Sequence, residues 1–126
     1  MRGLLDTSVF VAREQDRPLG ELPDEAAISV MTLAELHVGV LVAEDPIVRA
    51  QRLRTLTLVE RTFDALPVDD QVARRFVEIV AAARRQGHRP TIVDALIAAT
   101  AIRHDLPLYT QDDDFGSIPG VHAVRM

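Results

Sequence analysis

Short apolar runs alternate with longer stretches of helical periodicity along this chain of 126 residues. This alternation is typical of α/β folds with a mainly parallel sheet, because each parallel strand needs a crossover, usually a helix, before the next one. No internal repeat, low-complexity tract or flexible linker interrupts the pattern, so we expect a single domain over residues 1–126. The predicted strands are residues 3–5, 26–29, 65–68, 106–110 and 121–124.

Helices are predicted between these strands, where apolar residues recur three or four positions apart. Asp45 followed by Pro46 marks a helix start, since aspartate caps a helix and proline fits its first turn. The helix expected at 91–104 is apolar on nearly all sides, which indicates that it is buried. Pro67 makes the strand at 65–68 an expected edge strand, because proline has no N–H to donate. The predicted helices are residues 9–12, 32–44, 46–61, 70–86 and 91–104.

Composition excludes several kinds of site. The chain has no cysteine and no lysine, which removes disulfides, thiolate zinc sites, Schiff bases and lysine-containing phosphate loops. It has no apolar run of membrane-spanning length and no recognisable signal peptide, so we expect a cytoplasmic protein that does not contact a membrane. The net charge of −5 does not suit a uniformly basic nucleic-acid binder, although it allows local arginine patches.

Four acidic positions stand out because their neighbours are apolar. Asp6 ends the first predicted strand, and Asp112 opens an acidic triplet after the fourth. Glu35 and Asp94 lie within apolar helical stretches. Each position taken alone has an ordinary interpretation. Asp6 suits a turn or a helix cap, and the triplet suits a solvated loop.

Glu35 and Asp94 also fit an ordinary role in helix capping. Thr32 and Thr91 precede them by three positions, which matches the capping box in which an acid reaches back to its own helix start. The predicted topology favours a functional role over these ordinary interpretations. In a doubly wound sheet, strand ends and the starts of the following helices share one edge, where such folds bind ligands. We therefore expect all four carboxylates to converge there.

Carboxylates that converge in this way repel one another, so either their pKa values rise or a divalent cation neutralises them. Oxygen ligands without cysteine or clustered histidine point to Mg²⁺, with Mn²⁺ as an alternative, rather than to zinc. The four histidines show no ligand spacing and are interpreted as ordinary surface or core residues.

The four acidic motifs resemble, in their residues and their order, those of the PIN-domain nucleases of the VapC type. A lone Leu-Asp-Thr-Ser motif would be weak support, whereas four motifs in order in a chain of this length are specific. The resemblance covers essentially the whole chain. The matching segments are residues 5–9, 29–39, 94–101 and 108–115.

The resemblance implies a PIN-like three-layer α/β fold whose central, mainly parallel sheet has the strand order 3-2-1-4-5 and is flanked by helices. It implies an Mg²⁺-dependent endoribonuclease that cleaves RNA phosphodiesters with a metal-activated water. It also implies the toxin of a toxin–antitoxin pair, a homodimer, and a cognate antitoxin that inserts into the acidic pocket.

Carried over by position, the resemblance assigns the metal to Asp6, Asp94, Asp112 and Glu35. Asp114 matches a position that often joins the catalytic site, while Asp113 is expected to point away. Thr7, Ser8 and Thr110 match positions whose hydroxyls support the carboxylates or the attacking water.

Arginine suits contacts with RNA phosphates because of its planar fork. The group formed by Arg84, Arg85 and Arg89 is the preferred RNA contact, although a solvated helix face is the ordinary interpretation of any single member. No aromatic platform for base stacking is evident, which favours recognition of RNA by its shape.

Three other functions stay open on the sequence. One is a PIN nuclease of RNA processing outside toxin–antitoxin systems. Another is a catalytically silent PIN scaffold that only binds RNA or protein, against which the complete set of acids argues. A phosphoaspartate enzyme with Asp6 as the nucleophile is disfavoured, because the chain lacks lysine and a second aspartate at position 8.

Overall fold

A five-stranded parallel sheet organises the protein, whose computed structural model describes residues 2–126. The strand order is β3-β2-β1-β4-β5, and every neighbouring pair runs in parallel. This confirms the predicted α/β class and strand order. The strands are β1 (Arg2–Leu5), β2 (Glu25–Ser29), β3 (Ala65–Leu66), β4 (Leu108–Thr110) and β5 (Ala123–Arg125).

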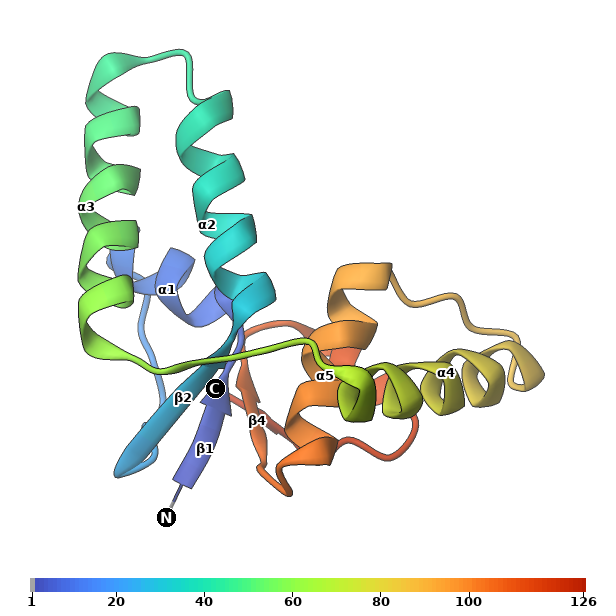
Figure 1. The fold of residues 1–126 in the computed structure, drawn as a ribbon. Helices are drawn as coiled ribbons and strands as arrows, with labels where there is room; N and C mark the ends of the chain where they lie inside the picture. Colours follow the sequence, from blue (N-terminus) through green and yellow to red (C-terminus); the bar gives the residue numbers. More distant parts are fainter. Residues whose placement is uncertain (1) are drawn as a thin grey trace.

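Helices connect the strands and cover both faces of the sheet (Figure 1). The helices α2 and α3 form a hairpin that projects away from the sheet, while α4 and α5 pack against each other on the other side (Figure 1). The helices are α1 (Thr7–Glu14), α2 (Val30–Val42), α3 (Pro46–Thr62), α4 (Asp70–Arg85) and α5 (Ile92–Arg103), with a short 3₁₀ helix η1 (Asp113–Ser117) before β5.

Alternation along the strands divides the core into two parts. Leu4 of β1 packs with residues of α4 and α5, whereas its neighbour Leu5 packs with residues of α1, α2 and α3. Leu108 and Tyr109 of β4 divide in the same way. Successive side chains of a strand point to opposite faces, so the sheet is the middle layer of three.

Two helices begin two residues earlier than predicted, α1 at Thr7 with Asp6 as its cap and α2 at Val30. Asp45 accepts a hydrogen bond from the Ile47 N–H at 2.8 Å, with Pro46 in the first turn, as predicted. The helix predicted to start at residue 32 begins instead at Val30, because the Ser29 hydroxyl caps it at the Met31 N–H, at 3.0 Å. The capping-box interpretation of Glu35 is therefore wrong.

Three strands are shorter than predicted, and the fifth, predicted at 121–124, is β5 at Ala123–Arg125. The third ends at Leu66, before Pro67, and lies at the edge of the sheet as expected. The fourth begins only at Leu108, after Pro107. Within residues 2–126 no helix has both the length and the apolar character that crossing a membrane requires.

Candidate functional site

The carboxylates singled out in the sequence come from five places that meet at the carboxyl edge of the sheet. Asp6 follows β1 directly and Asp112 follows β4. Asp94 is in the first turn of α5, and Asp114 is in η1. Glu35 lies in the second turn of α2 rather than the first, because that helix starts two residues earlier than predicted.

Electrostatic coupling shows that these carboxylates are close neighbours. The charges of Asp6, Asp94 and Asp112 each raise the pKa of Glu35. Those of Asp6, Asp112 and Asp114 each raise the pKa of Asp94. The fold therefore brings all five into one acidic cluster, which we define as Asp6, Glu35, Asp94, Asp112 and Asp114.

Asp6 is the most buried member of the acidic cluster, with 2% of its surface exposed. Burial raises its pKa above the ordinary value of 3.8, hydrogen bonds from Ser8 and Thr110 oppose that rise, and the charge of Asp112 adds to it. The hydroxyls of Ser8 and Thr110 donate to Oδ2 at 2.7 and 3.0 Å, and the Ser8 N–H donates to the same atom at 3.4 Å. These donors fix the carboxylate in place.

The hydrogen bonds to Asp6 all reach one oxygen. Within residues 2–126, no hydrogen bond reaches its Oδ1 atom, so one carboxylate oxygen is held and the other is left available as a ligand. The Thr110 hydroxyl also accepts the Asp112 N–H at 2.9 Å, and so ties the loop after β4 to the same point.

Glu35 is held by α1. The Thr7 hydroxyl lies 2.6 Å from its Oε1 atom and donates a hydrogen bond to it. Burial is the largest cause of the raised pKa of Glu35, and the Thr7 hydrogen bond opposes it. The hydroxyl of Thr32, which is fully buried, lies 3.1 Å from the Thr7 hydroxyl. Sequence reasoning missed this supporting role, having assigned Thr32 to a helix cap.

Asp94 combines a capping role with membership of the acidic cluster. The Thr91 hydroxyl accepts the Asp94 N–H at 3.1 Å, which is the first half of the predicted capping box. Burial is the main cause of the raised pKa of Asp94, a hydrogen bond with Thr91 opposes it, and the charges of neighbouring acids add to it. The carboxylate thus belongs to the helix start and to the acidic cluster at once.

The three residues of the acidic triplet differ in their surroundings. Asp113 is 90% exposed at its side chain and forms an ion pair with Arg125, whose Nε atom is 2.8 Å from Oδ1. The charges of Asp112 and Asp114, in contrast, act on Asp94. The charge of Asp113 is not among those that raise the pKa values of Asp6, Glu35 or Asp94.

The three arginines predicted to contact RNA also differ in their position relative to the acidic cluster. Arg84 and Arg85 are exposed in the last turn of α4. Arg89, in the loop before α5, lines a hollow of 220 Å³ together with Asp94 and Asp114. Only Arg89 of the three is thus brought beside the acidic cluster.

The donor set fits a hard cation that keeps part of its water. Within residues 2–126, no three His, Asp or Glu side chains form a group that could hold a metal ion by themselves. Mg²⁺ is usually bound through one or two carboxylates and retains several waters. Neighbouring carboxylates that raise one another's pKa suit that mode, because a bound cation would offset both their repulsion and the cost of burying their charge.

Comparison with known proteins relates the chain to one family. The sequence profile described as "PIN domain" matches residues 3–121. The chain is 47% identical over 126 residues to Ribonuclease VapC5 of Mycobacterium tuberculosis, covering 98% of this chain and 93% of that protein. It is 39% identical over 127 residues to Ribonuclease VapC4 of the same organism, covering 99% and 97%.

Solved structures extend the comparison. A crystal structure of VapBC-5 from Mycobacterium tuberculosis, described as a member of the VapBC family of toxin–antitoxin systems, matches with a TM-score of 0.89 and 44% identity. That match covers 99% of this chain and 98% of the other. FitAcB from Neisseria gonorrhoeae matches with a TM-score of 0.78 and 28% identity, over 100% and 97%.

Proposed function

The chain belongs to the PIN-domain family and is a VapC-type toxin endoribonuclease, and on that premise we propose that the acidic cluster is its metal-dependent cleavage site. The observation that carries the proposal is the convergence of five carboxylates at one edge of the sheet, where three of them have raised pKa values. Nothing in an ordinary helix cap or surface loop requires such a cluster. Enzymes of this family generally depend on a divalent metal ion.

We assign the metal, proposed to be Mg²⁺ with Mn²⁺ as a substitute, to Asp6, Glu35, Asp94 and Asp112, with Asp114 beside them. When bound, the ion would lower the pKa of the attacking water and stabilise the charge that develops on the phosphate. Hydrogen bonds from neighbouring hydroxyl groups orient the carboxylates that would bind it. Ser8 and Thr110 orient Asp6 so that Oδ1 is available, and Thr7 orients Glu35.

The substrate backbone requires cations outside the acidic cluster, because RNA carries one negative charge per phosphate. Arg89 is the proposed contact, since it lines the hollow that also contains Asp94 and Asp114. Arg84 and Arg85 are retained as contacts for more distant phosphates. Their exposed positions at the end of α4 suit long-range attraction rather than positioning at the cut.

We also propose two protein partners. The solved relatives include a member of a family of toxin–antitoxin systems and a toxin–antitoxin complex. An antitoxin segment that enters the acidic cluster would inhibit cleavage by excluding the metal and RNA. A homodimer is the second proposal. Exposed apolar side chains supply surface for such contacts, and they concentrate on α2 and α3, at Val38, Leu41, Val42, Ile47, Leu53 and Leu58.

Cleavage of RNA by purified protein tests the proposed function. Total cellular RNA is incubated with Mg²⁺, with Mn²⁺ or with EDTA, beside Asp6→Asn and Asp94→Asn variants whose folding is verified by circular dichroism. The proposal requires discrete cuts that need the metal and disappear in both folded variants. Equal cleavage by wild type and variants would reveal a contaminating nuclease.

The starting material must be free of antitoxin, since a bound inhibitor would hide the activity. If antitoxin-free protein cut no RNA with either metal, the nuclease assignment would fail for this chain and the silent scaffold would replace it. The cut ends sequenced from an active preparation identify the target RNA.

A further inference from the structure

A groove of 520 Å³ opens beside the acidic cluster, between α1, α2 and α3. Thr7 and Glu35 line one part of it, so the groove shares two residues with the proposed cleavage site. The remainder is lined by residues of mixed character. They include the apolar Val11, Leu36 and Val48 and the polar Gln51 and Arg52.

Arg52 is held in a defined position in this groove. Its Nη1 atom donates to the carbonyl of Gly39 at 2.8 Å, a contact that joins α3 to α2. An arginine side chain has five N–H donors in a planar fork, and this is the one hydrogen bond that the Arg52 side chain makes within residues 2–126. Most of its donors are therefore available to a ligand, from a side chain that is already anchored.

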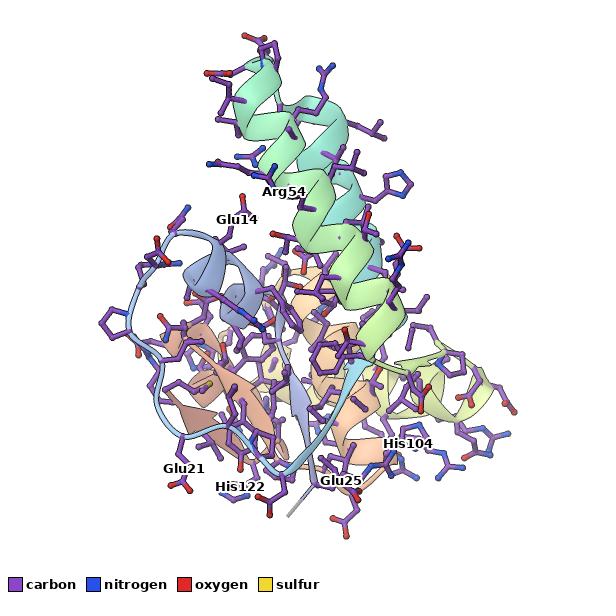
Figure 2. All side chains as sticks on the ribbon, turned by 90° about the vertical axis from the view of Figure 1, so that its left-hand side faces the viewer. Glu14, Glu21, Glu25, Arg54, His104 and His122 are labelled. Atoms are coloured by element: carbon purple, nitrogen blue, oxygen red, sulfur yellow. The ribbon has the colours of Figure 1, made fainter. Side chains whose placement is uncertain are left out.

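The second wall of the groove is acidic. Glu14 lines it as well, and its side chain points from α1 toward α3 (Figure 2), where it accepts a hydrogen bond from Thr55 at 3.0 Å. With Glu14 and Glu35 against a single guanidinium, the groove disfavours an anionic phosphate. It suits a neutral group with apolar faces and hydrogen-bonding edges.

A nucleobase has that chemistry. Its flat faces can pack on Val11, Leu36 and Val48, and its edges can accept from Arg52 and Gln51. The volume falls in the range of about 300–1,000 Å³ that is usual for small-ligand sites. Proteins read unpaired RNA bases by hydrogen bonds to their edges, and the arginine fork matches the O6 and N7 acceptors of guanine.

We propose that this groove receives a guanine base of the substrate RNA next to the cleaved phosphodiester, and that Arg52, assisted by Gln51, determines the preference for it. The inference rests on the proposed ribonuclease function. It implies that the substrate is unpaired at this nucleotide, because a base in a helix could not enter the groove. It also replaces recognition by RNA shape alone with the reading of one base edge.

The test uses the full chain, loaded with Mg²⁺, and an unstructured RNA library with a randomised segment. Sequencing of the cut ends gives the base preference at each position around the cut. Wild type should enrich guanine at one position within about two nucleotides of the cut. In Arg52→Gln that enrichment should fall about tenfold, within the range for loss of one bidentate base contact, and cleavage of sequences lacking guanine there should fall less.

The chain offers a matched control in Arg54. It lies on the same helix and is exposed (Figure 2). It does not line the groove, so Arg54→Gln should retain the wild-type preference. Because Arg52 also joins two helices, its variant could lose stability. Gln51→Ala, which removes an exposed side chain that makes no hydrogen bond within residues 2–126, therefore serves as a second variant and should weaken the guanine preference.

Three outcomes would overturn the inference, and they differ from failure of the proposed function. An unchanged guanine preference in folded Arg52→Gln and Gln51→Ala would show that the base binds elsewhere. A protein segment would then be the ligand to test in the groove. A uniform loss of cleavage at all sequences would reduce Arg52 to a structural link between α2 and α3. If active wild type showed no base preference, the groove would not be a base-binding site. If wild type itself cut no RNA, the nuclease assignment would fall first.

Discussion

The acidic cluster and the α2–α3 hairpin depart from an ordinary protein surface in opposite directions. At the acidic cluster a carboxylate, Asp6, is 2% exposed. On the hairpin Leu41 and Ile47 are 71% and 72% exposed. Buried charge costs free energy unless it is compensated, and apolar surface gains free energy when it is covered. Both features agree with the proposed roles, in which a cation and RNA bind at the acidic cluster and a protein partner covers the hairpin.

The two regions also differ in how the fold holds them. Hydroxyls of Thr7, Ser8 and Thr110 fix the carboxylates from several elements, over sequence separations as large as 104 residues. The hairpin combines contacts between α2 and α3 with contacts from each of these helices to the rest of the fold. Substitutions at the site should therefore change chemistry without unfolding the chain, whereas substitutions on the outer hairpin should change association.

The largest effect is expected within the acidic triplet. Asp112→Asn should lower the rate of RNA cleavage by about 10²-fold or more, the scale for losing one electrostatic stabiliser of a transition state. Asp113→Asn, one residue away, removes a carboxylate that pairs with Arg125 and should retain nearly full activity. Initial rates at saturating Mg²⁺ measure both. Equal losses in the two variants would contradict the division of the triplet.

The second largest effect is expected when the Thr110 hydroxyl, which donates to Asp6, is removed. Thr110→Val removes the donor to Oδ2 and the acceptor of the Asp112 N–H. It should cost about 1–3 kcal/mol in the free energy of unfolding, as expected when buried partners are left unsatisfied. Cleavage should fall about 10–100-fold, as for other residues that orient a metal ligand.

Thr100→Val is the control for that variant. Thr100 is also fully buried, but its hydroxyl bonds to the Leu96 carbonyl within α5. It should lose stability and keep its activity. Urea denaturation and cleavage rates, measured on both variants, separate the two roles. A Thr110→Val enzyme of unchanged activity would show that the hydroxyl supports the fold alone.

A smaller effect concerns the dependence of stability on pH in EDTA. Because the pKa of Asp6 is raised by burial above its ordinary value of 3.8, its charge destabilises the fold at any pH above the raised value. That cost disappears as the pH falls toward 3.8, since the folded state holds the proton more tightly. Asp6→Asn should therefore be more stable than wild type at pH 7.

The difference between Asp6→Asn and wild type should shrink as the pH is lowered through the raised pKa. Thermal unfolding in EDTA at a series of pH values measures it. Mg²⁺ should raise the melting temperature of wild type at pH 7 by binding the folded state, and raise that of the variant less. A difference that grew on acidification would have the wrong sign for a raised pKa.

The smallest effect on stability is expected on the outer hairpin. Leu53 and Leu56 lie on the same helix, but they are 50% and 4% exposed. Leu53→Ala should change the free energy of unfolding by less than about 0.5 kcal/mol, and Leu56→Ala should cost about 2–5 kcal/mol. Light scattering coupled to size exclusion should then show weaker self-association in Leu53→Ala. Unaltered association would place the dimer surface elsewhere.

Much of the fold follows from local patterns. Apolar runs, their spacing and the capping residues predict all five strands and their crossovers, because these features depend on neighbours in sequence. Errors concern boundaries, and the start of α2 shows why. Ser29 and Thr32 are both competent caps, and the sheet decides between them, since Ser29 is the last residue of β2 and its hydroxyl is already at the helix start.

The sequence alone predicted that Asp6, Glu35, Asp94 and Asp112 converge, because the ends of parallel strands and the starts of the following helices share one edge of the sheet. Only the tertiary structure decided how these side chains are arranged around the edge of the sheet. It separates Asp113 from its neighbours, brings Arg89 rather than Arg84 beside Asp94, and leaves one oxygen of Asp6 available. The direction of a side chain and the partners of its atoms depend on packing between elements distant in sequence, which no local pattern encodes.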